Sequence, residues 1–349
     1  MIAESAIPLR VASLLRRLPL LTLYLSERCN SRCVTCDYWR NGLRDMSLAS
    51  VTELLPSLQA LHTETVLISG GEPLLNPEWF EIAELLRDRG LGLWLLTSGL
   101  SLAKHVRRVV QVFDSITVSL DGTCRETYAA IRGVDAFDKV CTGIRQATDA
   151  GAALSLRVTL QRTNFRELPA FVDLAKALAV RQVSFLPVDV ANPHAFARQG
   201  GVTPALALAP EHLAEFEQLI GRLEREHADS FRSGFIAESP QKLRRMLQYF
   251  GAILGRDEYP DVRCNAPEFS AVVDASLRVR PCFFIPGTGD ADVHGKDLAD
   301  ALNLDGMGRL RASIRRGERS ECATCVCPLW RDTAHMQQLG LPCSDRIAG

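Results

Sequence analysis

Three cysteines within eight residues are the feature of this sequence with the clearest chemical meaning. Cys29, Cys33 and Cys36 follow a run of apolar residues in the order Cys-x-x-x-Cys-x-x-Cys. Three thiolates can hold a 4Fe–4S cluster and leave one iron without a protein ligand, and an open iron can bind a substrate or cofactor. The sequence therefore predicts chemistry at a metal cluster near the amino terminus.

Other uses of three cysteines fit this segment less well. A zinc site prefers four ligands in paired Cys-x-x-Cys groups, but the next histidine after Cys36 is His62. A disulfide framework is typical of small secreted chains, whereas this chain has 349 residues and no signal peptide. Inert buried cysteines are a third alternative, but the surrounding residues are polar. These polar neighbours are Arg28, Asn30, Ser31, Arg32 and Asp37.

The composition is that of an ordinary globular protein. Apolar residues make up 47% of the chain, and 40 basic residues nearly balance 41 acidic ones. The net charge of −1 gives no general attraction to nucleic acid or anionic membranes, so neither is an expected partner. No apolar run approaches the roughly 20 residues of a membrane span, and we interpret residues 1–19 as a leader helix. Eleven cysteines without a secretory signal predict a reducing, cytoplasmic location.

Short apolar runs alternate with amphipathic stretches over residues 20–190, at the spacing of repeated strand–helix units. Strands joined by helical crossovers predict a parallel sheet, in which ligands gather at the carboxyl ends of the strands. The three cysteines follow the first strand at that end. The expected strands are residues 20–25, 65–69, 91–96, 115–120, 154–160 and 182–188, with helices such as 47–61 and 77–89 between them.

The rest of the chain changes character twice. Residues 191–262 form a connector, in which a loop punctuated by proline and glycine precedes helical stretches at 211–227 and 240–254. From residue 263 to 349, a hairpin pattern around 271–282 and a dense cysteine group indicate a small α+β domain. The sequence thus predicts an α/β module followed by a connector and a cysteine-rich module.

A second element, Gly-Gly-Glu-Pro after the second strand, is by itself a weak turn signal. Together with the cysteine loop one unit earlier, it resembles the radical S-adenosylmethionine (radical SAM) superfamily. The resemblance implies a partial (β/α)6 TIM-like barrel and a 4Fe–4S cluster whose open iron binds the amino and carboxylate groups of SAM. The implied cluster ligands are Cys29, Cys33 and Cys36, and the residues implied to contact the SAM amino group are Gly70, Gly71, Glu72 and Pro73.

Further positions resemble the SAM pocket of that family, and ordinary turn or core chemistry also explains each of them. Ser98 ends the third strand, and Ser119 and Asp121 end the fourth, where polar groups could meet ribose hydroxyls or the methionyl carboxylate. Arg157 lies in an apolar strand and needs an anionic partner, which is either the SAM carboxylate or a structural carboxylate. Leu186, with the proline after it, could pack on adenine or belong to the core.

One position departs from the family pattern. Many relatives carry an aromatic residue before the third cysteine, where its ring lies against the adenine, but this chain has Thr35 there. Tyr38 or Trp39 is expected to compensate. The cluster ligands are unaffected by this departure.

A second cysteine group lies in the C-terminal module. Four thiolates of this kind can close a second cluster or a tetrahedral zinc site, and spacing does not choose between them. The group resembles the SPASM and twitch extensions of radical SAM enzymes, in which cysteines around a hairpin and a later Cys-x-x-Cys pair hold an auxiliary 4Fe–4S cluster. The resemblance therefore favours iron. The implied ligands are Cys264, Cys282, Cys322 and Cys325, with Cys327 as an alternative.

Three further cysteines have no metal role in this interpretation. Full SPASM domains carry seven cysteines and two auxiliary clusters, whereas this segment has six, so one auxiliary cluster is expected. Cys343 is predicted to be a bystander. Cys124 and Cys141 are predicted to be inert, although a cysteine near the pocket could donate a hydrogen atom.

The resemblance implies an enzyme that cleaves SAM to a 5′-deoxyadenosyl radical, with electrons from a donor such as flavodoxin or ferredoxin. We expect net oxidation or rearrangement of a small molecule, such as a sugar, an aminocyclitol or a cofactor precursor. The reason is that only about twenty residues precede the first strand, too few for the peptide-binding module of many peptide-modifying relatives. Maturation of a ribosomally synthesised peptide is the alternative. A non-catalytic zinc or redox scaffold is a third hypothesis.

Overall fold

The computed structural model describes residues 14–198, 201 and 203–338. Most of the predicted leader helix, and Cys343, lie outside these residues. Residues 14–19 belong to the same predicted helix but are not helical, which corrects that part of the prediction. Leu15 and Leu18 are buried there, and the backbone N–H of Leu18 donates to the carbonyl of Leu61 at 2.8 Å. This segment is therefore held by packing against the end of the first helix.

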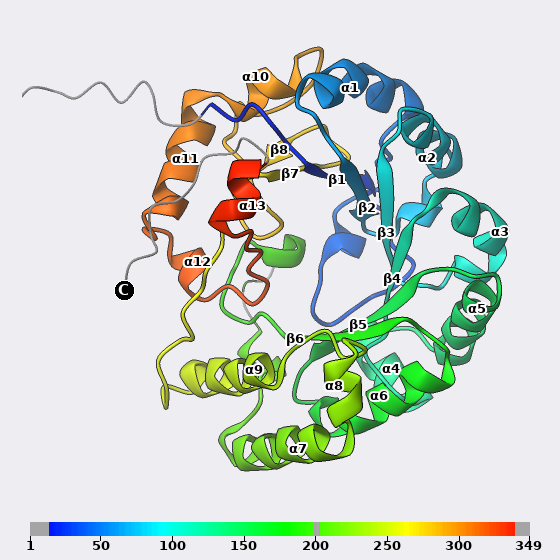
Figure 1. Cartoon of the computed structure of the whole chain (residues 1–349), viewed down its shortest axis with the longest axis vertical. Coiled ribbons are helices and arrows are strands. Elements are labelled where there is room, and N and C mark those ends of the chain that lie inside the picture. Colours follow the sequence, from blue (N-terminus) through cyan, green and yellow to red (C-terminus); the bar gives the residue numbers. More distant parts are fainter. Residues whose placement is uncertain (1–13, 199–200, 202, 339–349) are drawn as a thin grey trace, which may run out of the picture.

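Six parallel strands form the centre of the fold, and they lie side by side in the order in which they occur in the chain. The sheet is curved, and helices cover its outer side (Figure 1). The predicted parallel α/β arrangement is confirmed. The strands are β1 (Leu20–Ser26), β2 (Thr65–Gly70), β3 (Gly92–Thr97), β4 (Ser115–Ser119), β5 (Leu154–Leu160) and β6 (Gln182–Pro187).

The helices between these strands lie where the amphipathic stretches of the sequence predict them. The first is preceded by Ser47, whose side chain accepts a hydrogen bond from the N–H of Ser50 and so caps it. They are α1 (Leu48–Ala60), α2 (Trp79–Asp88), α3 (Leu102–Val112), α4 (Arg125–Arg132), α5 (Phe137–Asp149) and α6 (Leu168–Ala177).

The two faces of the sheet differ in composition. In β5, the residues at positions 154, 156, 158 and 160 are fully buried and apolar, while Ser155, Arg157 and Thr159 between them are part-exposed. This period of two places the apolar set against the helices and the polar set on the concave side. In register with Arg157 lie Ser119 of β4 and Ser184 of β6. The concave face is therefore lined by small polar side chains.

The C-terminal part returns to the same sheet. Strand β7 (Ser270–Val273) pairs parallel with β1, and β8 (Val279–Arg280) pairs antiparallel with β7. The predicted hairpin is confirmed, and its attachment to the edge of the main sheet was not foreseen. Helices α10 to α13 lie beside this edge (Figure 1). The remaining helices are α7 (Leu213–Glu226), α8 (Ala228–Arg232), α9 (Pro240–Ile253), α10 (Leu298–Leu302), α11 (Asp305–Arg315), α12 (Ser320–Ala323) and α13 (Thr333–Gln338).

Short 3-10 helices mark several loops. Two of them lie at the motifs described in the sequence. The helix η1 lies just beyond the cysteine loop, and η2 begins at the proline of Gly-Gly-Glu-Pro. In the described residues they are η1 (Tyr38–Arg40), η2 (Pro73–Leu75), η3 (Phe165–Glu167), η4 (Ala195–Ala197), η5 (Pro204–Leu206), η6 (Pro210–His212) and η7 (Ala266–Glu268).

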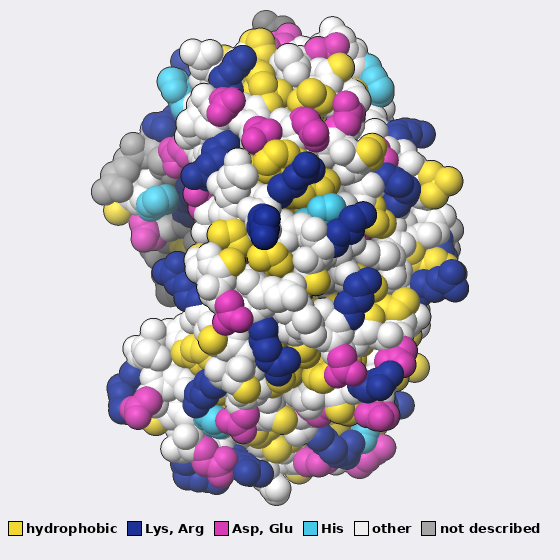
Figure 2. Space-filling model, turned by 90° about the vertical axis from the view of Figure 1, so that its right-hand side faces the viewer, with side chains coloured by type: hydrophobic (Ala, Val, Ile, Leu, Met, Phe, Trp, Pro, Cys, Tyr) yellow, Lys and Arg dark blue, Asp and Glu magenta, His cyan; other side chains and the backbone are white. Residues whose placement is uncertain are grey.

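The outer helices carry charges of both signs. Figure 2 shows basic, acidic and apolar side chains interspersed over the face on the right of Figure 1, where α3 contributes the exposed Lys104, Arg107 and Arg108. Such mixing is consistent with the near-zero net charge. Within the described part of the chain, no helix combines the length and apolar character needed to cross a membrane.

Candidate metal centre

The loop that carries the first three cysteines is held against the end of α4. The backbone N–H of Arg32 donates to the carbonyl of Arg132 at 2.9 Å, and that of Val34 donates to the carbonyl of Ile131 at 3.0 Å. Gly133 follows α4 with a φ of 68°, and a Cβ atom there would lie 2.3 Å from the carbonyl oxygen of Arg32. Only glycine allows both the backbone conformation and this close approach. Backbone contacts to a neighbouring helix thus set the path of the loop.

The three thiols of this loop lie close enough to influence one another. Burial, with the charge of Cys33 acting in the same direction, raises the pKa of Cys29 to about 11 and that of Cys36 to about 12. Burial also raises the pKa of Cys33, while the Arg132 guanidinium opposes this shift. Buried thiols that repel each other as thiolates ionise together only when a cation compensates them, as metal ions do. The donor set therefore fits a metal cluster.

The arrangement differs from that of a single-ion site. Among the residues that the structure describes, no three His, Cys, Asp or Glu side chains converge as the ligands of one metal ion do. In a 4Fe–4S cluster each thiolate binds a different iron, so the ligands need not converge on one point. Cys29, Cys33 and Cys36 remain the ligands predicted for the first cluster.

The Gly-Gly-Glu-Pro segment packs on the start of the cysteine loop. The N–H of Gly71 donates to the carbonyl of Ser26 at 2.8 Å, and that of Glu72 donates to the carbonyl of Arg28 at 2.7 Å. A Cβ atom on Gly70 would lie 2.7 Å from the Ser26 oxygen, and one on Gly71 would lie 2.4 Å from the Arg28 oxygen. The two glycines thus let the end of β2 touch the backbone that leads into the first cysteine.

The side chain of Glu72 has partners within the protein. Its carboxylate is fully buried and accepts hydrogen bonds from Thr97 Oγ1 at 2.8 Å, from the N–H of Ser98 at 2.8 Å and from the N–H of Leu74 at 3.2 Å. The hydroxyl of Ser98 also contacts it. This carboxylate therefore ties β2 to β3. Pro73 is buried at the start of η2.

Asn30 connects this network to the cysteine loop. Its Oδ1 lies 3.1 Å from Ser98 Oγ, and its Nδ2 donates to Ser101 Oγ at 3.2 Å. Ser101 directly precedes α3. No role was predicted for Asn30, although its position directly after the first cysteine was a signal that could have indicated one. Two segments that are distant in sequence, the cysteine loop and the stretch between β3 and α3, thus meet at this asparagine.

The two residues predicted after β4 have different surroundings. Asp121 is 2% exposed, and its carboxylate accepts hydrogen bonds from Arg132 Nη1 at 3.0 Å and from the N–H of Thr159 at 2.7 Å. These contacts support the structural explanation for Asp121. Ser119 remains part-exposed on the concave face, in register with Arg157. Of the two, Ser119 is the one available to a bound molecule.

Arg157 is a cation on this concave face with an unsatisfied group. Its Nε is buried and has no hydrogen-bond partner in the described part of the chain. The residue as a whole is part-exposed. A buried N–H group without an acceptor is costly, because it has lost its water and gained no hydrogen bond in return. The unsatisfied donor is compatible with an anionic group of a bound molecule, and contact with the SAM carboxylate stays a prediction.

Tyr38 packs between the cysteine loop and the C-terminal hairpin. Its N–H donates to Cys36 Sγ at 3.5 Å, and its ring meets that of Tyr24 edge-on, with centroids 5.5 Å apart. The Tyr24 ring lies 6.1 Å from that of Phe283, the residue after Cys282. Tyr38 is therefore committed to an aromatic cluster between the two cysteine-bearing regions.

Tertiary structure brings five C-terminal cysteines into a second group. Burial raises the pKa of Cys282 to about 11 and that of Cys322 to about 12, and thiols of the same group add to both shifts. The pKa of Cys325 is also raised, mainly by burial and then by the charges of Cys327, Cys264 and Cys282. Each of the four ligands implied by the resemblance is thus influenced by at least one other thiol of the group, and Cys327 influences Cys264, Cys282 and Cys325. The group holds one more thiol than a closed cluster needs.

The remaining predicted positions lie in structural surroundings. Cys141 is 4% exposed inside α5, and Cys124 is exposed just before α4 with its Sγ 3.4 Å from Thr127 Oγ1. Leu186 is partly buried against the core, and Pro187 is buried. These observations agree with the structural alternatives considered for each residue.

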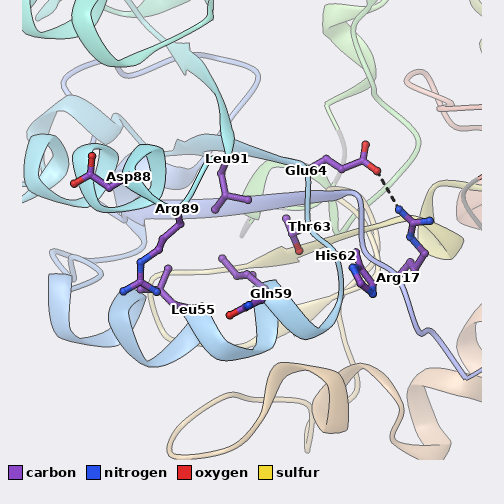
Figure 3. A pocket seen from close by; sticks show the side chains of 10 residues that line it. Arg17, Leu55, Gln59, His62, Thr63, Glu64, Asp88, Arg89 and Leu91 are labelled. Atoms are coloured by element: carbon purple, nitrogen blue, oxygen red, sulfur yellow. Dashed lines mark hydrogen bonds and ion pairs between the residues drawn. The ribbon is translucent and has the colours of Figure 1, made fainter.

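Two cavities lie away from the cysteines. One of about 590 Å³ opens near the amino ends of β2 and β3, where Arg17 forms an ion pair with Glu64 at 3.4 Å (Figure 3). Another of about 820 Å³ lies on α3 and α5. The first cavity is at the opposite end of the strands from the cysteine loop. Neither cavity is lined by a residue of the predicted site.

Comparisons with known proteins agree with this geometry. Residues 23–175 match the family model described as the radical SAM superfamily. Fe-coproporphyrin III synthase of Methanosarcina barkeri is 29% identical over 173 residues, which cover 48% of this chain and 43% of that protein. Mycofactocin maturase MftC of Mycobacterium tuberculosis is 29% identical over 161 residues, which cover 44% of this chain and 41% of that protein. The matched region spans less than half of each relative.

A solved structure extends the likeness to most of the chain. SuiB of Streptococcus suis, bound to S-adenosylmethionine, has a TM-score of 0.65 and 14% identity, and the match covers 92% of this chain and 77% of that one. At this identity, the likeness concerns the fold. It includes more than the region matched by the family model, since that region ends at residue 175.

Proposed function

Because residues 23–175 form a radical SAM domain, we propose that this chain is an enzyme that cleaves SAM reductively and abstracts a hydrogen atom from a carbon of its substrate. The observation that carries the proposal is the contact between two sequence elements. The glycines of Gly-Gly-Glu-Pro pack directly on the backbone that leads into the three cysteines. This contact places a set of three thiols beside a turn whose backbone carbonyls can accept from an ammonium group.

Different residues of the chain bind the first cluster and SAM in this proposal. Cys29, Cys33 and Cys36 hold the first cluster. A 4Fe–4S cluster bound there would supply the electron for the reductive cleavage of SAM. Arg157, with its unsatisfied Nε, neutralises the SAM carboxylate. Ser119, in register with it, offers a hydroxyl on the same face.

The other predicted SAM-pocket residues act as positioning residues in this proposal. Glu72 and Ser98 are bonded to each other, and Asp121 is paired with Arg132. These buried contacts hold the ends of β2, β3 and β4 in place, so that the groups that meet SAM are preorganised. Backbone carbonyls of Gly70 and Gly71 accept from the SAM ammonium group.

We assign the second cysteine group to an auxiliary 4Fe–4S cluster of the SPASM or twitch type. Its five thiols come from three separate segments, and each is close enough to at least one thiol of another segment for their charges to interact. The assigned ligands are Cys264, Cys282, Cys322 and Cys325, with Cys327 as the alternative. Such a cluster suits an oxidoreductase, because it can accept an electron left on the substrate.

Two substrate classes are supported by the relatives. A small molecule is the first, and the name of Fe-coproporphyrin III synthase points to a tetrapyrrole. A peptide is the second, since one relative is named a maturase and SuiB has also been solved with the precursor peptide SuiA. A low-potential donor such as flavodoxin or ferredoxin supplies the electrons. A reducing cytoplasm, expected from the cysteine content, keeps the ligands as thiols.

Anaerobic purification of three proteins tests the proposal. Wild type should be brown, contain roughly eight irons per chain as two clusters, and form 5′-deoxyadenosine from SAM with dithionite. Cys33→Ala should lose 5′-deoxyadenosine formation and about half of the iron. The exposed Cys124→Ala is the matched control and should behave as wild type. A colourless wild-type protein that binds zinc would support the scaffold hypothesis instead, and 5′-deoxyadenosine formation by Cys33→Ala would refute the ligand assignment.

A further inference from the structure

The loop after β6 touches both cysteine groups through one residue, Phe196. Its carbonyl accepts a hydrogen bond from the N–H of Asp37 at 3.0 Å, and Asp37 directly follows Cys36. Its ring packs edge-on against that of Phe284, with centroids 5.5 Å apart and planes at 88°. The N–H of Phe284 in turn donates to Cys282 Sγ at 3.4 Å. A single residue thus contacts the neighbour of a predicted ligand in each group.

The backbone at this point adopts an unusual conformation. Phe196 has φ of 55° and ψ of 31°, and Ala197 has φ of 57°. Two successive residues other than glycine in the left-handed region are rare, because the Cβ atom crowds the backbone. Such conformations persist where the surrounding structure holds them, and they concentrate at functional sites.

Buried polar contacts hold this loop in place. Asp189 Oδ1 accepts from the N–H groups of Ala191 at 3.0 Å and Asn192 at 2.9 Å. Arg198 Nη1 lies 3.6 Å from the same oxygen and donates to the carbonyl of Asn192 at 2.6 Å. Both charged side chains are at most 3% exposed. The two ends of the loop are therefore clamped together inside the protein.

A second contact leads to the same point of the C-terminal module. Asn192 is 2% exposed, and its Nδ2 donates to the carbonyl of Phe284 at 2.9 Å. Phe284 therefore receives both a ring contact and a hydrogen bond from this loop. The loop is bound by two independent interactions to Phe284, two residues after Cys282, and by one to Asp37, which follows Cys36.

We propose that Phe196 is a positioning residue that couples the two cysteine sites, so that a cluster at the C-terminal site stabilises the ligand loop of the first. The inference rests on the proposed function, because it requires both sites to hold clusters. A cluster bound at Cys282 restricts the motion of Phe284, and Phe284 in turn restricts the ring of Phe196. The backbone carbonyl of Phe196 accepts the hydrogen bond from Asp37, the residue that follows Cys36. By thermodynamic linkage the effect is reciprocal. The aromatic contact through Tyr24 is left intact in every variant below.

A double-mutant cycle tests the coupling. The four proteins are wild type, Cys282→Ser, Phe196→Ala and the double variant. The readouts are the rate at which a chelator removes iron from the first cluster and the EPR spectrum of that cluster with and without SAM. Each single variant should accelerate iron loss about 5- to 10-fold, a size typical of coupling between sites. The double variant should be no faster than either single variant.

Two further variants separate positioning from general destabilisation. Phe196→Tyr keeps the ring and should restore the wild-type rate. Ala197→Gly keeps the ring and accepts the positive φ more readily, so it should also match wild type. If Cys282→Ser does not fold, Cys325→Ser replaces it, because Cys325 belongs to the same group.

The outcomes distinguish this inference from the proposed function. If the wild type holds clusters and the two substitutions multiply each other's effect on the rate of iron loss in the double variant, the coupling is refuted and the proposed function stands. An unchanged rate in Cys282→Ser would do the same. Absence of any cluster from the wild type, with no SAM-dependent EPR signal, would refute both.

Discussion

Glu72 Oε1 lies 2.8 Å from Thr97 Oγ1, and this bond joins the carboxyl ends of β2 and β3 inside the protein. The same carboxylate accepts from the N–H of Ser98. The acidic residue of Gly-Gly-Glu-Pro is thus a buried structural acceptor. Its importance for the site comes from the positions of the strand ends that it holds.

Replacing Glu72 with alanine should destabilise the protein even without cofactors. Two backbone N–H groups and two hydroxyls would lose their acceptor in a buried place, at a cost of about 2–4 kcal/mol in the free energy of unfolding. Glu72→Gln keeps one acceptor oxygen and should lose less. Urea unfolding of the cluster-free proteins measures the difference. Wild-type stability of Glu72→Ala combined with loss of SAM binding would show instead that the carboxylate meets SAM directly.

Arg157→Met should weaken SAM binding without destabilising the cluster-free protein, in contrast to Glu72→Ala. The guanidinium has an unsatisfied buried Nε, so removing its charge should leave the stability of the cluster-free protein unchanged or raise it. SAM affinity of the cluster-loaded protein should fall about 10- to 100-fold, as expected for a lost hydrogen bond to a charged group. Thermal unfolding and equilibrium dialysis with SAM provide the two measurements. A large loss of stability would indicate a structural ion pair.

Gly71→Ala should disturb the cysteine loop. Its Cβ atom would lie 2.4 Å from the carbonyl oxygen of Arg28, so the backbone before the first cysteine must move. We expect a loss of about 1–3 kcal/mol in stability and incomplete loading of the first cluster, measured as iron per chain. Gly308→Ala in α11 is the control, because nothing lies within 4 Å of an added Cβ atom there. Equal iron contents in the two variants would count against the predicted contact.

Asp114 provides a pH-dependent test of the scaffold. Burial raises its pKa, but hydrogen bonds from Arg87 and from the N–H of Leu93 outweigh this and lower it. Because the folded pKa is depressed, the stabilisation is present above the unfolded pKa, about 3.9, and is lost as the pH falls through the folded value. Asp114→Asn should therefore cost about 1 kcal/mol or less at pH 7, since the pair is nearly half exposed.

The difference between wild type and Asp114→Asn should shrink below pH 4. Chemical unfolding at several pH values measures it. A difference that stays constant from pH 7 to pH 3 would show that the charge of Asp114 contributes nothing. Arg87→Met is the companion variant and should lose the same pH dependence, because it removes the partner of the carboxylate.

The strands could be predicted from the sequence because their signals are local, and the first cysteine site stays a prediction drawn from an equally local motif. The apolar runs gave all six parallel strands to within about one residue at each end. The leader helix was the exception, since residues 14–19 have no helix. Leu15 and Leu18 are buried there, and their N–H groups donate to Asn303 and Leu61, which are distant in sequence. A short apolar stretch does not show whether it will be a helix or an extended segment.

By itself, the sequence determined which residue types are close along the chain: three thiols in one loop and two glycines at one strand end. Only the tertiary structure decided which side chains are left free and which are already bonded. Asp121 turned out to be paired with Arg132 and Glu72 with Thr97, while Arg157 kept an unsatisfied Nε. The link from Phe196 to both cysteine groups is of the same kind. Such contacts join segments far apart in sequence, so they depend on how the strand ends and loops pack, which no local pattern encodes.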